Sequence, residues 1–201
     1  ADGTFHPNEK VNRAAALKIL VAAVAPERVQ QGASTVYTDV PATAWYAPYI
    51  AVAQADLGII DGPPKTSTFR PEANISKVEF LKLLFGAYKV DTAGAYSEIK
   101  LPLASDVMDN AAWFYPYMRY AISASVTMVG ADGKLNPAAE LTRGNIAEMM
   151  YRYLTYRDGL RLQALLSEAE TELVNVMQMI ESKDVVQAEF ASARALLAAR
   201  G

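Results

Sequence analysis

Three basic residues stand at equivalent places in the chain, each directly after a residue type that favours the N-cap of a helix. They are Arg13 after Asn12, Lys77 after Ser76 and Arg143 after Thr142. Each cation is predicted to be the first residue of a helix, where it opposes the helix dipole at a cost of up to about 1 kcal/mol. Backbone N–H groups at a helix start attract anions. This pattern favours three sites for the carboxylate or phosphate of a ligand.

A structural role for the same cations is the alternative. Each of them can reach an Asp or Glu in a neighbouring part of the chain and form an ion pair that supports the fold. In the ligand-binding interpretation, the helix-start amides assist the cations, together with Asn12, Ser76 and Thr142. The sequence leaves both roles open.

Aromatic side chains offer a second kind of ligand contact, because a sugar ring can stack on their faces. Trp45 and Trp113 are candidates to line a binding groove. Tyr49 and Tyr117 each follow four residues later and are predicted to be core residues, since aromatic residues at helical spacing are more often buried.

These residues recur because the chain is repetitive. Phe5, Phe69 and Leu135 correspond, at steps of 64 and 66 residues, within a block that occurs three times. A second block occurs twice and matches Trp45 with Trp113. Residues 1–158 are therefore predicted to form one domain with two full repeats and the back half of an earlier one, divided as 1–30, 31–95 and 96–158.

Each block is predicted to contain a helix. In the first block the apolar residues follow the i, i+3, i+4, i+7 spacing of one helix face. They are Leu17, Leu20, Val21 and Val24 in the first copy, Leu81, Leu84, Phe85 and Tyr88 in the second, and Ala147, Met150, Tyr151 and Leu154 in the third. The second block predicts helices over residues 45–57 and 113–125. No alternating pattern lasts long enough for a sheet, so the fold class is predicted to be all-α.

Residues at the ends of these helices support the assignment. Ser76 and Glu79 fit a capping box at one helix start. Pro26 is expected to stop the first helix, and Gly58 is a predicted C-cap. Val126 takes the corresponding place in the later copy, so that helix is expected to end differently.

The spaced elements together resemble a known family. Asp-Val, Trp-x-x-x-Tyr-Ile, Gly-Ile-Ile-x-Gly, Phe-x-Pro and a final polar–basic pair follow one another as in the S-layer homology (SLH) domain, over about residues 1–156. The resemblance implies a pseudo-threefold helical bundle. It also implies noncovalent anchoring of a surface-layer or surface protein to envelope polysaccharide, often a pyruvylated secondary cell-wall polymer, at a prokaryotic cell surface.

The family's Thr-Arg-Ala-Glu motif falls on residues 12–15, 76–79 and 142–145. The cation is kept in all three copies, but the acid only as Glu79. The resemblance therefore implies ligand binding in grooves between repeats by Arg13, Lys77 and Arg143, with Glu79 beside them. A structural lattice or filament subunit that has lost glycan binding is the alternative, and the two missing acids favour it.

Composition excludes several other classes. The net charge is −3, so the chain lacks the basic footprint of a nucleic-acid-binding protein, and it has no Cys for thiol chemistry. The longest apolar run, residues 19–25, is far short of the roughly 18 residues that span a membrane. No zinc motif, nucleophile elbow or phosphate loop occurs, so no enzyme activity, cofactor or metal is expected. His6 aligns with Arg70 and Asn136 and predicts no special role.

The C-terminal segment has a different pattern. From residue 159 onward it predicts an amphipathic helical hairpin, because two heptad patterns flank a short polar turn. The first has Leu162, Ala169 and Val176 with Leu166, Leu173 and Ile180; the second has Val186 and Ala193 with Phe190 and Leu197. The hairpin is expected to cover a groove left by the half repeat or to mediate self-association; the alternative is a stalk. Because the chain begins without Met, it is expected to be a processed product or a fragment.

Overall fold

A computed structural model describes residues 3–62 and 65–157 and, beyond them, only residues 169, 171, 188, 191, 192 and 195. The chain divides into two compact units, Ala1–Leu154 and Thr155–Gly201. The first unit is described below. The predicted hairpin over residues 159–201 and the domain boundary at residue 158 lie outside the described residues.

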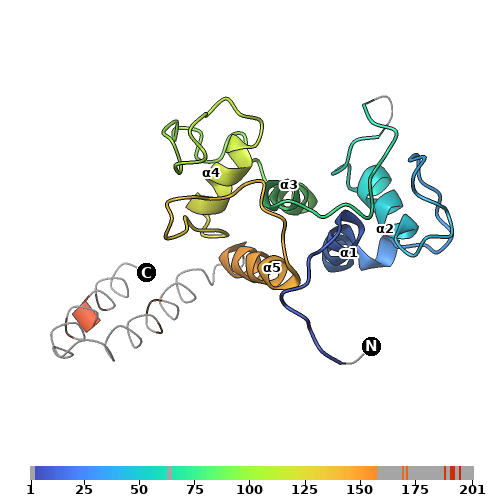
Figure 1. The fold of residues 1–201 in the computed structure, drawn as a ribbon, viewed down its shortest axis with the longest axis horizontal. Helices are drawn as coiled ribbons and strands as arrows, with labels where there is room; N and C mark the ends of the chain where they lie inside the picture. The colour runs from blue at the N-terminus through green and yellow to red at the C-terminus, as the bar shows by residue number, and fades with distance from the viewer. Residues whose placement is uncertain are drawn as a thin grey trace. The chain divides into compact units, whose positions relative to one another are not determined.

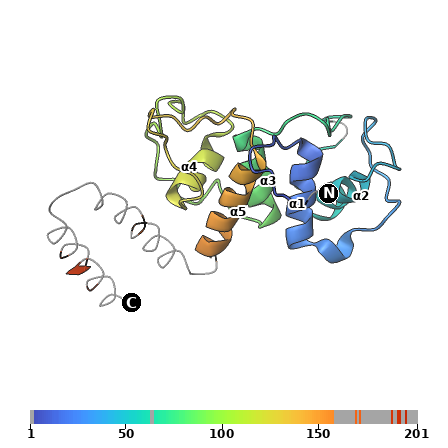
Figure 2. The same ribbon diagram turned by 60° about the horizontal axis from the view of Figure 1, so that its bottom comes forward.

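The described part of the chain is helical, as predicted. It contains α1 (Arg13–Val24), a 3₁₀ turn η1 (Pro26–Arg28), α2 (Ala47–Ala51) continued by the π-helical turn η2 (Val52–Asp56), α3 (Lys77–Ala87), α4 (Tyr115–Ser123) and α5 (Arg143–Arg157). Isolated β-bridges are present, but the described residues form no strand. Helices α1, α3 and α5 lie side by side, with α2 packed on α1 and α4 on α3 (Figures 1 and 2).

The helix starts follow the predicted caps. The Asn12 side chain accepts from the Ala15 amide at 2.8 Å at the start of α1. Ser76 and Glu79 form the capping box of α3. At the start of α5, Asn145 takes the place of an acid, and its Oδ1 accepts from the amide of Thr142 at 3.1 Å. All three capping residues therefore stabilise a helix end.

The other helix ends agree with the sequence as well. Helix α1 ends at Val24, two residues before Pro26. Gly58 follows the π-helical turn with a φ of 63°, in the left-handed region that glycine tolerates best. In the later copy Val126 aligns with Gly58, but the left-handed residue is Ser125, with a φ of 58° directly after the C-cap of α4. The two helices therefore differ in the aligned position at which they end, as expected from Val126.

A ring of backbone hydrogen bonds joins the three helix starts. The amide of Val11 donates to Leu141, that of Leu141 to Ile75, and that of Ile75 back to Val11, each at 3.0 Å. All three side chains are buried. Because the ring runs from each copy to the next and closes on the first, segments 130 residues apart in the chain are held together.

The core lies along the inner faces of the long helices. Leu17, Leu20, Leu81, Leu84 and Phe85 are fully buried, as the spacing predicted. For α5 the predicted stripe is wrong by one residue, because two stripes with the same spacing run side by side on this helix. The buried one consists of Ile146, Met149, Met150 and Tyr153, whereas Tyr151 is 61% exposed and Ala147 is exposed.

The tyrosine prediction also needs correction. Tyr49 and Tyr117 are only partly buried. Helices α2 and α4 are short and bury the positions two before and one after these tyrosines: Ala47 and Ile50 on α2, and Tyr115 and Met118 on α4. Tyr49 and Tyr117 lie beside that face.

Two aspartates fix the loops that precede the long helices. Asp39 accepts from the amides of Phe69 and Arg70 at 2.8 and 2.7 Å, and Asp106 accepts from those of Leu135 and Asn136 at 2.9 and 2.7 Å. The middle residue of each Phe-x-Pro loop, which reads Leu-Asn-Pro in the third copy, lies in the left-handed region: His6 (φ 50°), Arg70 (60°) and Asn136 (50°). Burial acts to raise the pKa of the Asp106 carboxyl, but the two amides hold that pKa below its ordinary value.

Candidate ligand-binding grooves

The three cations are the first residues of α1, α3 and α5, and each reaches into the next copy of the repeat. Arg13 Nε donates to the carbonyl of Phe69 at 3.0 Å, Lys77 Nζ to that of Leu135 at 2.5 Å, and Arg143 Nε to that of Phe5 at 2.8 Å. The guanidinium groups of Arg13 and Arg143 also lie 5.0 and 5.1 Å from the ring centroids of Phe69 and Phe5. The cations therefore tie neighbouring repeats together.

Arg13 also forms an ion pair with Glu79. The Nη1–Oε1 distance is 2.8 Å, and the pair joins the start of α1 to the start of α3. This is the structural role that the sequence left open. At the positions that correspond to Glu79, α5 carries Asn145 and the first copy carries Ala15, so a matching pair cannot form at Lys77 or Arg143.

The prediction that helix-start amides are available to a ligand is wrong. The first two amides of each long helix donate to carbonyls of the next Phe-x-Pro loop. The pairs are Arg13–Ala73, Ala14–Pro71, Lys77–Ala139, Val78–Pro137, Arg143–Glu9 and Gly144–Pro7, at 2.8–3.0 Å. The amides of Ala15, Glu79 and Asn145 contact the caps. The next repeat thus satisfies the amides that a helix leaves open.

The surroundings of these groups shift their pKa values. Burial lowers the pKa of Arg13, and the charge of Glu79 opposes that shift. Burial also lowers the pKa of Lys77, against the carboxylates of Asp106 and Asp132. Burial acts to raise the pKa of Glu79, but hydrogen bonds from Ser76 and the charge of Arg13 outweigh it and hold that pKa below its ordinary value.

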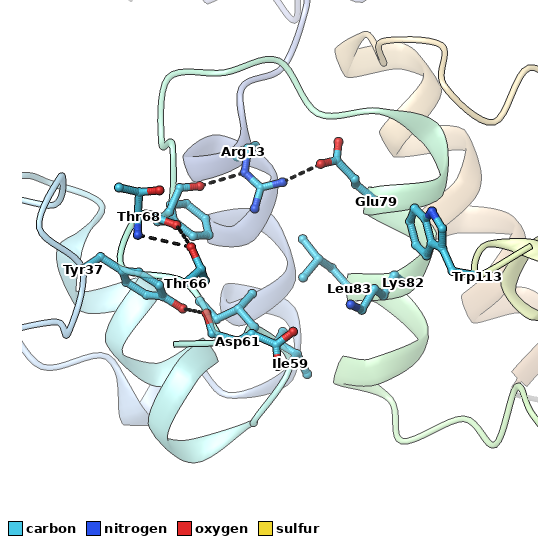
Figure 3. A pocket seen from close by; sticks show the side chains of 12 residues that line it. Arg13, Tyr37, Ile59, Asp61, Thr66, Thr68, Glu79, Lys82, Leu83 and Trp113 are labelled. Atoms are coloured by element: carbon cyan, nitrogen blue, oxygen red, sulfur yellow. Dashed lines mark hydrogen bonds and ion pairs between the residues drawn. The ribbon is translucent and has the colours of Figure 1, made fainter. Parts of the chain in front are cut away.

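A cavity of about 260 Å³ lies between α1 and α3, and we call it the first groove. Arg13 and Glu79 lie at one end, and Lys82 and Leu83 of α3 line its wall (Figure 3). Ile59, Asp61 and Tyr37 face them, and the Tyr37 hydroxyl donates to the Asp61 carbonyl at 2.5 Å. The groove thus combines charged, hydroxyl and apolar surfaces, as binding sites for polar ligands do.

A second groove of about 390 Å³ lies between α3 and α5. It occupies the equivalent place in the next copy. Lys77 corresponds to Arg13, Asn145 to Glu79, Glu148 to Lys82 and Met149 to Leu83, and residues 127–129 correspond to residues 59–61. Glu148 pairs with Arg152 in this groove, with an Oε1–Nε distance of 3.1 Å.

The two tryptophans differ in their surroundings. Trp113 is 59% exposed and lines the first groove (Figure 3). Trp45 is 52% exposed and lines neither groove; Lys18 Nζ lies 5.2 Å from its ring centroid.

The sequence analysis did not identify Lys18 and Lys82 as candidate site residues. Both stand five residues after a helix-start cation, and this repeated spacing could have indicated them.

Comparison with known proteins agrees with this repeated architecture. The family model of the S-layer homology domain matches residues 36–81 and 105–147. The chain therefore carries two S-layer homology domains, which indicates association with the cell surface or cell wall. The half repeat at residues 1–30 lies outside both matches.

One curated relative is a Bacillus anthracis protein named as an uncharacterized cell wall amidase. It is 33% identical over 90 residues, which cover 45% of this chain and 16% of the relative. The chain therefore spans a small part of that protein's length. Among the described residues, no helix is both long enough and apolar enough to cross a membrane.

Proposed function

We propose that this chain anchors a surface-layer or surface protein noncovalently to the cell wall by binding an anionic polysaccharide, such as a glycan linked to peptidoglycan. The observation that carries the proposal is the recurrence of one groove at equivalent places between neighbouring repeats. The cyclic hydrogen bonds support a pseudo-threefold bundle as the scaffold. The module is proposed to be non-catalytic, to need no cofactor or metal, and to act at the cell surface.

The polysaccharide is proposed to lie along the grooves. Its anionic groups would meet the groove walls, whose basic residues are Arg13 and Lys82 in the first groove and Lys77 and Arg152 in the second. Trp113 would stack on a sugar ring at the first groove. The roles of Asn12, Ser76 and Thr142 are indirect, because their side chains hold the helix starts.

Arg143 and Trp45 are candidates for a third contact, near the half repeat. Arg143 reaches Phe5 of the first copy, and Trp45 lies beside Lys18 on α1. These residues correspond to three that line the first groove. Arg143 matches Arg13, Lys18 matches Lys82, and Trp45 matches Trp113.

A structural lattice subunit is the second candidate function. The observation in its favour is the lack of an acid at two of the three motif positions, Ala15 and Asn145. Such a subunit would associate with copies of itself and would not require the polysaccharide.

Cosedimentation distinguishes these functions. The full chain is mixed with purified sacculi from the source organism, before and after the wall polysaccharide is stripped from them. Anchoring predicts that the chain pellets with intact sacculi and stays in the supernatant with stripped ones. Equal pelleting with both preparations, or with neither, contradicts the proposal. Light scattering of the chain alone then reports whether it forms the assemblies that a lattice subunit requires.

A further inference from the structure

We propose that Lys82, and not the motif cation Arg13, binds the anionic group of the polysaccharide, and that the first groove is the anion-selective one of the two. Arg13 is a positioning residue that holds the groove walls together. This inference rests on the proposed function and assigns its charged contact to one residue that lies outside the repeated motif.

The guanidinium of Arg13 already has several partners within the protein. Its Nε donates to Phe69, its Nη1 pairs with Glu79, and its plane lies over the Phe69 ring. An anion that approached Arg13 would compete with the Glu79 carboxylate, which is held in place by the Ser76 hydroxyl at 2.8 Å and the Ser76 amide at 2.9 Å. A ligand therefore gains little from this cation.

Lys82 lies in the same groove, and its ammonium forms no hydrogen bond or ion pair with the described residues. Its side chain is half-buried in the wall formed by α3 and is directed toward the interior of the groove (Figure 3). Within the described part of the chain, no acceptor lies within hydrogen-bond distance of its ammonium. The two acids that line the groove have other partners: Glu79 pairs with Arg13, and Asp61 accepts from Lys65 at 2.9 Å. The Lys65 hydrogen bond lowers the pKa of Asp61, and the charge of Lys82 acts on it in the same direction.

The two grooves differ in how their charges are paired. Two cations, Arg13 and Lys82, and two carboxylates, Glu79 and Asp61, line the first groove, but Asp61 pairs with Lys65, which lies outside the lining. The second has two of each: Lys77 and Arg152 with Glu140 and Glu148. Glu148 stands where Lys82 stands in the first groove and pairs with Arg152, and the Lys77 ammonium donates to Leu135. Both cations that line the second groove therefore have partners within the protein.

Trp113 completes the site. It lines the first groove together with Lys82, and 59% of its surface is exposed. Because the ring is exposed, it can stack on the sugar that carries the anionic group. The site thus fits a saccharide bearing a carboxylate or a phosphate, with Lys82 binding the charge and Trp113 the ring.

The test compares Lys82→Gln and Lys82→Glu with Lys100→Gln and Lys100→Glu, in the full chain. Lys100 is exposed and lines neither groove, so it controls for the change in net charge. Affinity for intact sacculi is measured by cosedimentation over a range of salt concentrations. Lys82→Gln is expected to weaken binding about 10- to 100-fold and to flatten its salt dependence. Lys82→Glu is expected to weaken it further, while both Lys100 variants bind as the unchanged chain does.

Arg13→Gln supplies the second measurement. It is expected to lower the melting temperature but, below the melt, to change affinity by less than about threefold. Equal binding by the Lys82 and Lys100 variants overturns the assignment to Lys82 while leaving the proposed anchoring function intact. If folded Arg13→Gln loses affinity while Lys82→Gln binds as the unchanged chain does, then Arg13, and not Lys82, binds the anionic group. If the unchanged chain does not require the polysaccharide, both the inference and the proposed function fail.

Discussion

At the residue scale, one repeated position has three different surroundings. Arg13, Lys77 and Arg143 all donate to a carbonyl of the next repeat. Within the described part of the chain, only Arg13 of the three also pairs with a carboxylate, that of Glu79 at the last position of the next motif. The contacts show that a basic residue at a helix start can be structural even when its helix dipole disfavours it, because the neighbouring loop supplies acceptors.

Removing the cross-repeat contacts is expected to destabilise the fold. Arg143→Ala loses the hydrogen bond to Phe5 and the contact with its ring, so its free energy of unfolding should fall by about 1–2 kcal/mol. Lys100→Ala lacks such contacts and should change it by less than about 0.5 kcal/mol. Thermal melts followed by circular dichroism measure both. Equal stability of the two variants would show that the carbonyl contact at Arg143 contributes nothing.

The Glu79 carboxylate is expected to make stability depend on pH. Because its pKa in the fold lies below the ordinary value of 4.5, its contribution is present above pH 4.5 and is lost as pH falls through the lower folded value. Glu79→Gln keeps a capping residue but removes the charge. The variant should be less stable than the unchanged chain by about 1 kcal/mol at neutral pH, and this difference should shrink at acid pH. Melts across that range test the sign; a difference that grows toward acid pH would contradict it.

At the element scale, local signals predicted the helices well. N-cap residues, the capping box, Pro26 and Gly58 mark helix ends through contacts within a few residues, and the structure confirms each of them. Long-range contacts were not predictable in the same way. The helix-start amides find acceptors in loops about 60 residues away or further, and the spacing of α5 fits two adjacent stripes equally well.

The same limit explains the candidate site. The motif cations and Trp113 carry a repeated signal, so the sequence singled them out. The position of Lys82 is occupied by Glu148 in the third copy, so the charge at this position is not repeated. Its importance depends on which acids are already paired, and only the folded arrangement determines that.

The residues that follow the C-caps of η2 and α4 allow a matched test of backbone conformation. Gly58 and Ser125 both have φ near +60°, and a Cβ added at Gly58 meets no atom within 4 Å. Gly58→Ala should therefore cost about 1 kcal/mol through backbone conformation alone, whereas Ser125→Gly should stabilise the fold by several tenths of a kcal/mol or more. Chemical denaturation measures both values. Changes of the same sign would show that side-chain contacts, and not φ, decide these positions.

At the scale of the whole molecule, the closed ring of hydrogen bonds makes the repeats interdependent. Val11, Ile75 and Leu141 come from three different copies, yet each amide depends on a carbonyl of another copy. We therefore expect these three amides to exchange with deuterium at similar, slow rates, because opening one requires separation of the repeats. Hydrogen exchange followed by NMR tests this. Much faster exchange at Leu141 than at Ile75 would show that the third copy opens independently.

The most direct test of wall binding uses the two tryptophans of the chain. In Trp45→Phe, Trp113 in the first groove is the only indole, and polysaccharide released from sacculi is titrated against this variant while its fluorescence is recorded. Occupation of the groove predicts a saturable change in intensity or emission maximum that Lys82→Gln shifts to higher polysaccharide concentration. Unchanged Trp113 fluorescence at concentrations that release the chain from sacculi would contradict binding at this groove.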